Sequence, residues 1–379
     1  SYYYIRMNEK NFDVYIDLGS SKIRVGVFSR IEKKQFFFTE YKSFNNLKNN
    51  KLNLSESENI IKKTISEIEE KTNDYVNDVN LMVDSPDSLL VTVSISKNME
   101  GKKLKKEEIQ YLIQDLKQQI IKSYKDKNII HILVTNYNLD GANYSFIPLN
   151  INCKKFYIDI AFICFPKKLV KSLEEIFSKN NIVINQIVST TYAKALSYKK
   201  KIDTVKKILF VDIGYEKTSI IFYNNENFNS LNILPIGGNH ITKDISKILN
   251  IKLEKAEEIK LNFNKSEFKN TADLIKKIVF ARIEEILELS IDCLPPEDKK
   301  NGLKKIKLIL MGEGSKILDT RFKDSISFSS DIDLLEETTH DICDSGLNLN
   351  IGLSNQEVTI IPKKQEKKGF FERLFHLFK

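Results

Sequence analysis

The segment DVYIDLGSSKIRVGVF, residues 13–28, contains two short runs of alternating apolar residues, separated by a Gly-Ser-Ser turn. Alternation of period two on both sides of a glycine-containing turn is typical of a β-hairpin. A similar pattern returns over residues 207–223, where an apolar strand ends in Asp212-Ile-Gly214 and a second strand follows. The repeated pattern predicts two related halves of mixed α and β structure.

Composition excludes several classes of protein. The chain has 379 residues, a hydrophobic fraction of 41% and a formal net charge of +8, and this length allows two or three domains. The lysines are spread along the chain and mixed with acidic residues, so a solvated surface is expected and a nucleic-acid partner is not. No apolar run of about 18 residues occurs, so no membrane-spanning helix is expected. The four cysteines match no zinc or redox spacing.

A separate unit is expected between the two hairpins. A strand over residues 89–95 is followed by a long helix over about residues 105–124, with its apolar residues on one stripe. Further strands are expected at residues 129–135 and 156–165. The expected domains are a first half over residues 1–87 and 167–203, an inserted subdomain over 88–166, and a second half over 204–361 with an outer subdomain at about 236–304.

Three loops carry residue types that suit phosphate binding. Two are Asp-x-Gly turns at Asp17 and Asp212, and the third is the turn Met311-Gly-Glu-Gly-Ser after a late strand. Glycine lets the backbone approach a charged ligand, and the backbone N–H groups of such turns form anion-binding nests. Two carboxylates that face each other across a cleft suit a hydrated Mg²⁺ ion. Asp17 and Asp212 are therefore the candidate catalytic and metal-holding residues.

The order of these loops resembles the two phosphate motifs and the adenosine motif of the actin-like ATPase superfamily. Within it, the segments Pro235-Ile-Gly-Gly-Asn-His-Ile-Thr242, Ala256-Glu-Glu-Ile-Lys260 and Arg282-Ile-Glu-Glu-Ile286 are similar to the FtsA family of bacterial cell division proteins. The inserted unit after the early strands is similar to that family too. The resemblance runs from about residue 12 to the end of the chain.

The resemblance implies an α/β actin-like fold that binds ATP and Mg²⁺ between its halves. It places Lys22 near the phosphates, and Glu257 and Lys260 near the ribose and adenine. The resulting candidate nucleotide contacts are Gly19, Ser20, Ser21, Lys22, Gly214, Glu257, Lys260, Gly312, Gly314 and Ser315.

The resemblance also implies partners. It predicts self-association into filaments and binding of the C-terminal peptide of the tubulin-like protein FtsZ through the outer subdomain, with Arg282 as the candidate contact on a helix over residues 271–293. The inserted subdomain is expected to contact other division proteins. The implied location is the cytoplasmic face of the inner membrane at the mid-cell division site.

The second phosphate motif departs from the superfamily pattern. Tyr215 and Glu216 stand where further glycines are usual, and Lys217 offsets the charge of Glu216. The helix over residues 189–198 has no Glu or Gln to position an attacking water. We therefore expect nucleotide binding with slow hydrolysis at most. A fold that kept its turns and lost the nucleotide is the alternative.

The end of the chain predicts a membrane-binding helix. Residues 362–368 have the charged composition of a linker, and residues 369–379 form a short amphipathic segment. A helix of this length would extend roughly 16 Å at about 1.5 Å per residue, too short to span a bilayer. An apolar face with a basic rim is typical of a helix in the membrane interface; a helix that docks on the core is the alternative. The candidate membrane contacts are Phe370, Phe371, Leu374, Phe375 and Phe378.

Three other functions remain open. A PilM-type pilus-assembly adaptor shares the inserted subdomain but would not need its own terminal helix. A sugar or acetate kinase would need a catalytic Asp in the first half to activate the substrate hydroxyl, and no convincing candidate is present. A filament protein of the MreB type has a different subdomain arrangement.

Overall fold

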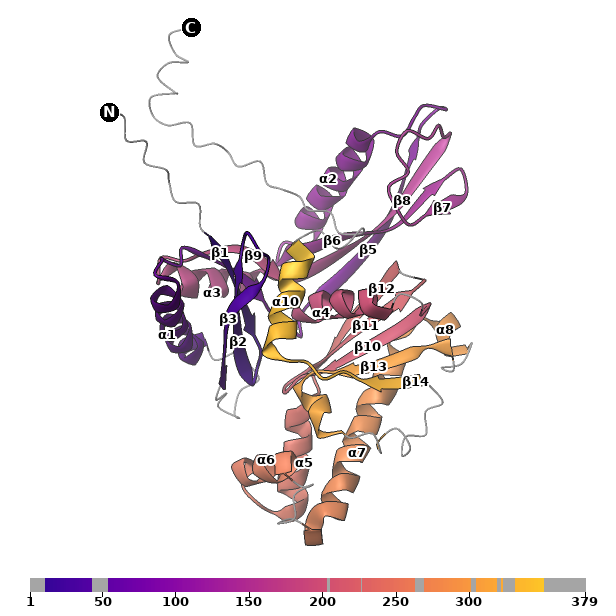
Figure 1. The fold of residues 1–379 in the computed structure, drawn as a ribbon. Coiled ribbons are helices and arrows are strands. Elements are labelled where there is room, and N and C mark those ends of the chain that lie inside the picture. Colours follow the sequence, from indigo (N-terminus) through magenta and orange to yellow (C-terminus); the bar gives the residue numbers. More distant parts are fainter. Residues whose placement is uncertain are drawn as a thin grey trace, which may run out of the picture.

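A computed structural model describes the chain at residues 11–42, 54–202, 205–225, 227–262, 269–300, 305–318, 322 and 331–350. These residues form three sheets, two of five strands and one of four, with helices packed around them (Figure 1). The predicted linker and membrane-binding helix, residues 362–379, lie outside the described residues. Within the described part, no helix is long and apolar enough to cross a membrane.

The two five-stranded sheets share one topology. In each, the first strand pairs antiparallel with the second and parallel with the fourth, so the predicted pair of related halves is confirmed. The first sheet has the order β3 (Gln35–Lys42), β2 (Lys22–Ser29), β1 (Phe12–Leu18), β4 (Asp78–Met82), β9 (Val183–Val188). The second has the order β12 (Asn227–Leu234), β11 (Thr218–Asn224), β10 (Lys207–Ile213), β13 (Lys307–Met311), β14 (Asp331–Leu334).

The four-stranded sheet forms a unit of its own at the top of Figure 1. One face of helix α2 (Lys106–Ser123) packs on it through a buried stripe, because apolar residues recur at helical spacing. Its strands, in sheet order, are β5 (Leu89–Asn98), β8 (Lys155–Pro166), β6 (Lys127–Leu139) and β7 (Ala142–Tyr144). The unit interrupts the first half between β4 and β9. The domain boundaries drawn from the sequence stay predictions.

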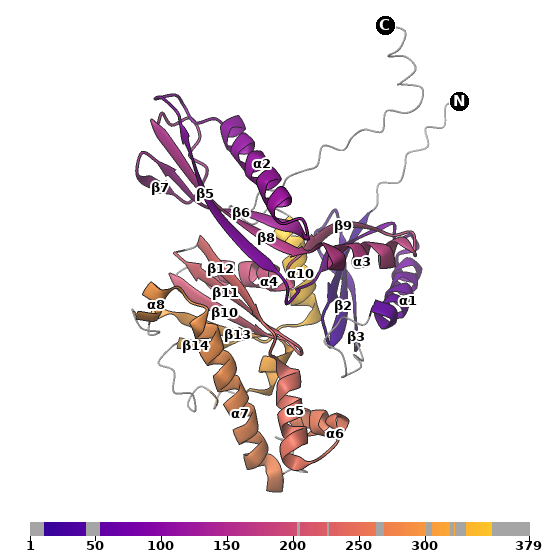
Figure 2. The ribbon, with the colours of Figure 1, turned by 180° about the vertical axis from the view of Figure 1, so that it is seen from behind.

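The remaining helices belong to the two halves. Those of the first half are α1 (Leu54–Thr72), α3 (Lys167–Ser178) and α4 (Thr190–Lys199), followed by the 3₁₀ turn η1 (Lys200–Ile202). Helices α5, α6 and α7 lie together at the far end of the second half (Figure 2). The elements of the second half are α5 (Gly238–Leu249), α6 (Leu253–Asn262), α7 (Lys269–Asp292), α8 (Pro296–Lys300), the 3₁₀ turn η4 (Glu313–Ile317) and α10 (Thr339–Asn350).

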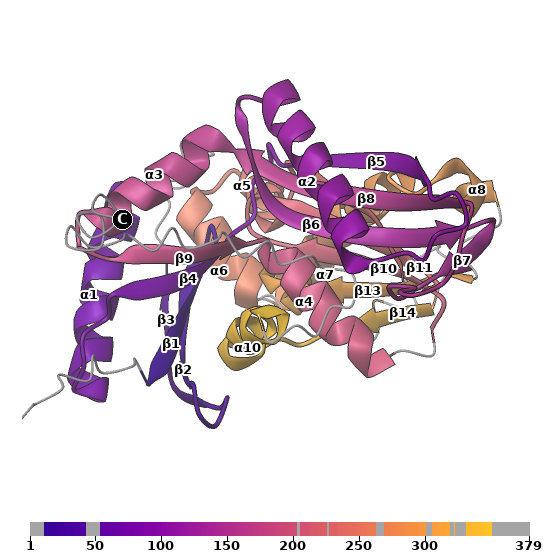
Figure 3. The ribbon, with the colours of Figure 1, turned by 90° about the horizontal axis from the view of Figure 1, so that it is seen from above.

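Apolar packing joins the two halves behind the cleft that separates their hairpin turns. The ring of Tyr192 on α4 lies 5.9 Å from that of Phe228 on β12, edge to face, and Phe228 lies 5.9 Å from Tyr223 on β11. Helix α10 runs beside α4 and packs on β2, as the view from above shows (Figure 3). Its approach requires glycine, because a Cβ on Gly26 would lie 2.6 Å from the Cβ of Cys343. The floor of the cleft is therefore a continuous apolar core.

Candidate functional site

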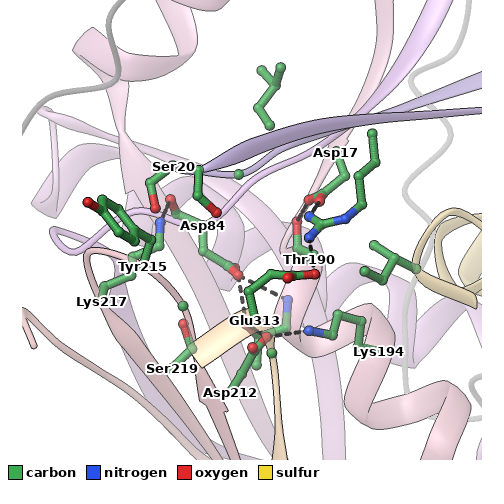
Figure 4. Close-up of a pocket in the computed structure, with 18 of the residues that line it drawn as sticks. Asp17, Ser20, Asp84, Thr190, Lys194, Asp212, Tyr215, Lys217, Ser219 and Glu313 are labelled. Carbon is green, nitrogen blue, oxygen red and sulfur yellow. Dashed lines mark hydrogen bonds and ion pairs between the residues drawn. The ribbon is translucent and has the colours of Figure 1, made fainter. Parts of the chain in front are cut away.

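A cavity of about 90 Å³ lies where the two hairpin turns meet the loop after β13 (Figure 4). It is bounded by β1 and α4 of the first half and by β10 and η4 of the second. The sequence-predicted residues that line it are Asp17, Gly19, Ser20, Ser21, Asp212, Gly214 and Gly312. The tertiary structure therefore brings the two predicted phosphate turns to one cavity.

Asp17 is the next-to-last residue of β1 and is almost completely buried. Its Oδ2 accepts a hydrogen bond of 2.8 Å from Nη1 of Arg24, and its Oδ1 accepts one of 2.9 Å from Oγ1 of Thr190. Burial raises the pKa of Asp17, while Arg24 and Thr190 act in the opposite direction. Both carboxylate oxygens are therefore occupied by protein donors.

Arg24 extends from this pair to the second half. Its Nη2 donates a hydrogen bond of 2.9 Å to Oε1 of Glu313, at the start of η4. Lys22 also reaches Glu313, at 3.1 Å, and Glu40, at 3.0 Å, but it does not line the cavity. Burial would raise the pKa of Glu313, yet Lys316, Arg24 and Lys22 lower it to about 2. Glu313 is thus a fixed anion that ties the two halves together.

Asp212, the next-to-last residue of β10, holds a second ion pair between the halves. Nζ of Lys194, from α4, lies 2.7 Å from Oδ2 of Asp212 and 2.9 Å from Oε2 of Glu337. Oγ1 of Thr191 donates to the same Asp212 oxygen at 2.9 Å. Burial acts to lower the pKa of Lys194, but Asp212 and Glu337 outweigh it and the pKa is raised. Lys194 therefore remains a charged ammonium.

Gly312 is required by the turn after β13. Its φ is +91°, in the region that favours glycine, and a Cβ there would lie 2.3 Å from Oδ1 of Asp212. Its N–H donates a 3.1 Å hydrogen bond to Oε2 of Glu337. The glycine thus brings the third loop against the Asp212 carboxylate.

Lys217, in the second hairpin turn, closes the cavity on its other side. In Figure 4 it lies to the left of the cavity and Lys194 to the right. Its Nζ donates a hydrogen bond to the backbone carbonyl of Asp84, which follows β4. Burial lowers the pKa of Lys217, against the attraction of Asp84, Asp17 and Asp212. Lys217 belongs to the second half and Asp84 to the first, so this contact also crosses between the halves. The Asp84 carboxylate in turn accepts from the backbone N–H of Thr191 at the start of α4.

Besides Lys22, four predicted nucleotide contacts lie outside the cavity lining. Lys260 is buried and lies 2.7 Å from Glu257, and it donates to the carbonyl of Gly238 at 3.1 Å. Gly314 packs against the backbone of Ile213, where a Cβ would lie 2.8 Å from the carbonyl oxygen. Ser315 donates to the carbonyl of Gly312 at 2.8 Å. The ring of Tyr215 lies against Lys260, 5.5 Å from its Nζ, and itself lines the cavity.

Arg282, the predicted partner contact, joins two helices of the outer subdomain. From α7 it donates to Asp244 on α5 through Nε at 2.7 Å and Nη2 at 2.8 Å, and Nη1 lies 2.5 Å from Glu285. Its side chain is 23% exposed. The guanidinium therefore has a structural role between α5 and α7 and remains in reach of solvent.

The residues present fit a phosphate better than a metal ion. Both turns approach the cavity with glycine backbone, and Lys194 and Lys217 line it. Asp17 and Asp212, however, already hold protein cations, and the described residues contain no cluster of three or more His, Cys, Asp or Glu that would hold a metal. Small-molecule sites usually measure about 300–1,000 Å³, so a whole nucleotide would require the halves to separate.

Several lining residues were missed by sequence reasoning: Arg24, Asp84, Thr190, Thr191, Lys194 and Glu337. The sequence could have pointed to Arg24, because the register of the hairpin places it directly opposite Asp17. The sequence signal for Lys194 is weaker: it is a lysine between two alanines on a short helix. Nothing in the sequence distinguishes Glu337 from Glu336.

Sequence comparisons match this chain to bacterial cell division proteins. The family profile for "Cell division protein FtsA" matches residues 209–294. The FtsA of Helicobacter pylori strain J99 is 26% identical over 148 residues, 39% of this chain and 30% of the relative. The FtsA of Agrobacterium fabrum is 24% identical over 268 residues, 61% of this chain and 59% of the relative. The matched part thus spans about a third to three fifths of these relatives' length.

Solved structures share the fold along almost the whole chain. The PilM-PilN type IV pilus biogenesis complex aligns with a TM-score of 0.61 at 14% identity, over 90% of this chain and 98% of that one. The ethanolamine utilization protein EutJ of Carboxydothermus hydrogenoformans aligns with a TM-score of 0.51 at 12% identity, over 89% of each. The predicted α/β fold class is confirmed as the actin-like ATPase fold. The sequence matches confirm the predicted resemblance of this chain to the FtsA family of bacterial cell division proteins.

Proposed function

We propose that this chain is a scaffold of bacterial cell division, which self-associates into actin-like filaments, holds ATP between its halves, binds FtsZ and is tethered to the inner membrane by residues 369–379. The observation that carries the proposal is the sequence match over residues 209–294. This segment runs from β10 through the second hairpin turn to the end of α7. It therefore contains a phosphate turn and most of the outer subdomain that is expected to bind FtsZ.

The cleft supports nucleotide binding with little turnover. The backbone of Gly19 and Gly214 allows close approach of phosphate oxygens, and Lys217 supplies positive charge at the same cavity. The start of α4 offers Ser189, Thr190 and Thr191 where a carboxylate or amide would be needed to orient water. The chain's residues thus bind and orient phosphates, while the five carboxylates among the described lining residues, Asp17, Asp84, Asp212, Glu313 and Glu337, already contact protein donors. The expected Mg²⁺ has no vacant carboxylate pair in this cleft.

The outer subdomain has features of a peptide-binding surface. Ile248 on α5, Leu261 on α6 and Leu274 on α7 are 55%, 62% and 42% exposed. Exposed large apolar side chains on neighbouring helices are typical of interaction sites. Arg282 provides a charge on the same subdomain, held in place by Asp244. These residues support the assignment of FtsZ binding to α5–α7.

Binding of a labelled FtsZ C-terminal peptide, followed by fluorescence polarisation, tests this assignment. Arg282→Ala is expected to weaken binding about tenfold, or ~1.4 kcal/mol. Asp244→Ala removes the partner of Arg282 and keeps its charge, so binding is expected to be retained. The matched control is Arg30→Ala, which breaks a comparable pair with Asp13 in the first half. Equal losses in Arg282→Ala and Asp244→Ala would show that the α5–α7 contact matters and that Arg282 does not touch the peptide.

A fluorescent fusion of the full chain, with and without residues 369–379, tests the tether and the division role in dividing cells. A mid-cell band that becomes diffuse on truncation is expected. A signal indifferent to the truncation contradicts the tether. A polar or diffuse signal from the full chain would favour the pilus-assembly alternative, whose fold likeness alone does not separate it from a division protein.

A further inference from the structure

The cleft between the halves contains two protein cations at the place where a divalent metal was expected. Arg24 lies 2.8 Å from Asp17, and Lys194 lies 2.7 Å from Asp212. Each cation also reaches a second acid from the second half, Glu313 at 2.9 Å and Glu337 at 2.9 Å respectively. Arg24 and Lys194 thus each bridge an aspartate and a glutamate.

We propose that Arg24 and Lys194 together take the place of the divalent cation in this cleft, so that neither its closed form nor a nucleotide bound in it requires Mg²⁺. For the nucleotide, the inference rests on the proposed function; for the closed cleft, it does not. Arg24 and Lys194 become specificity-determining residues, because they decide which cation accompanies the phosphates.

Charge and geometry both support the substitution. Two unit charges equal the charge of one Mg²⁺ ion, and each lies on one of the two aspartates that would have held it. Both side chains are about as buried as their partners, with 7% exposure for Arg24 and 6% for Lys194. Solvent therefore screens these pairs little. Arg24 and Lys194 are part of the chain and neutralise the aspartates permanently, whereas a metal ion would bind and dissociate.

A hydrated Mg²⁺ ion would have to displace these pairs. The ion retains several waters and dehydrates reluctantly, and the cavity of about 90 Å³ is already crossed by Lys217, which reaches Asp84. Displacement would leave a buried guanidinium or ammonium without its carboxylate, which is costly. Binding of the metal is therefore opposed by the same contacts that close the cleft.

Thermal unfolding of the full chain, with excess Mg²⁺ or with EDTA, tests the inference. The wild-type Tm is expected to be the same in both. Lys194→Met removes the charge and nearly keeps the volume, so Asp212 and Glu337 become free to bind Mg²⁺; its Tm is expected to fall in EDTA and to rise by about 3 °C or more when Mg²⁺ is added. Lys102→Met, at an exposed pair with Glu100, is the matched control and should not respond to Mg²⁺. Arg24→Met is the second variant if Lys194→Met does not fold.

Two results of the Tm experiment would overturn the inference. A wild-type Tm that rises with Mg²⁺, or a folded Lys194→Met that ignores it, overturns the inference. In parallel, a fluorescent ATP analogue should bind the wild type with equal affinity in Mg²⁺ and EDTA. A loss of about tenfold in EDTA overturns the inference and leaves the proposed nucleotide site intact. If the analogue binds under neither condition, ATP drops out of the proposed function, and the Tm comparison alone decides whether the two cations replace the metal in the closed cleft.

Discussion

Asp17 and Arg24 face each other across the first hairpin, and their side chains form an ion pair of 2.8 Å that is almost fully shielded from water. The pair is local in sequence, but its second acid, Glu313, comes from the other half of the chain. The hairpin therefore does more than present a phosphate turn, because the charge it buries also fastens the two halves together.

Replacing Arg24 should destabilise the protein strongly. Arg24→Met leaves the buried Asp17 carboxylate without its cation, which typically lowers the free energy of unfolding by about 3–5 kcal/mol. Urea unfolding followed by circular dichroism measures the change. Adding Asp17→Asn to Arg24→Met removes the orphaned charge and should recover part of the loss. If the double variant is less stable than Arg24→Met by the full cost of Asp17→Asn alone, the two side chains are not coupled.

Glu313 should make stability depend on pH in the acid range. Its pKa is lowered to about 2 from the usual 4.5, so its contribution is fully present above about pH 4.5 and is lost as the pH falls toward 2. Unfolding free energies of the wild type and Glu313→Gln, measured from neutral pH downward, should differ most near neutrality and converge below pH 4.5. A difference that stays constant across this window would contradict the ion pairs of Glu313 with Arg24 and Lys22.

Gly312 should tolerate no side chain. Gly312→Ala combines a positive φ with a Cβ placed 2.3 Å from the Asp212 carboxylate, and overpacking of this kind costs roughly 1–3 kcal/mol beyond the backbone strain. Gly141 is the matched control, because its φ of +93° is similar and no atom lies within 4 Å of its added Cβ. Differential scanning calorimetry should therefore show a larger fall in Tm for Gly312→Ala than for Gly141→Ala. Equal falls would mean that only the backbone conformation matters.

Tyr215 should limit access to the predicted adenosine side of the cleft. Its ring lines the cavity and covers Lys260, 5.5 Å away. Tyr215→Ala should enlarge the cavity and expose the Lys260 ammonium, so an ATP analogue should bind about fivefold tighter, ~1 kcal/mol. Lys260→Met added to Tyr215→Ala should remove the gain. Weaker binding by Tyr215→Ala would instead show that the ring itself contacts the nucleotide.

Local patterns in the sequence determined much of the fold. Period-two alternation predicted both hairpins, and the helical stripe over Ile109, Ile113, Leu116 and Ile120 predicted α2, because these elements bury one face formed by residues close in the chain. Strands β7, β12 and β14 escaped prediction: β7 is only three residues long, β12 is an edge strand that pairs with β11, and β14 is a short edge strand that pairs with β13.

The charges of the cleft were decided by the tertiary structure alone. The two phosphate turns were visible in the sequence because glycine and aspartate mark a turn wherever it occurs. Lys194 and Glu337, however, lie on segments far apart in the chain, and a lysine or glutamate in a sequence gives no sign that it will be buried. Only when α4 packs between β10 and the start of α10 does Lys194 meet Asp212 and Glu337. An ion pair is a relation between two positions in space, so the sequence by itself determined where the turns form, and the folded chain decided which cations they hold.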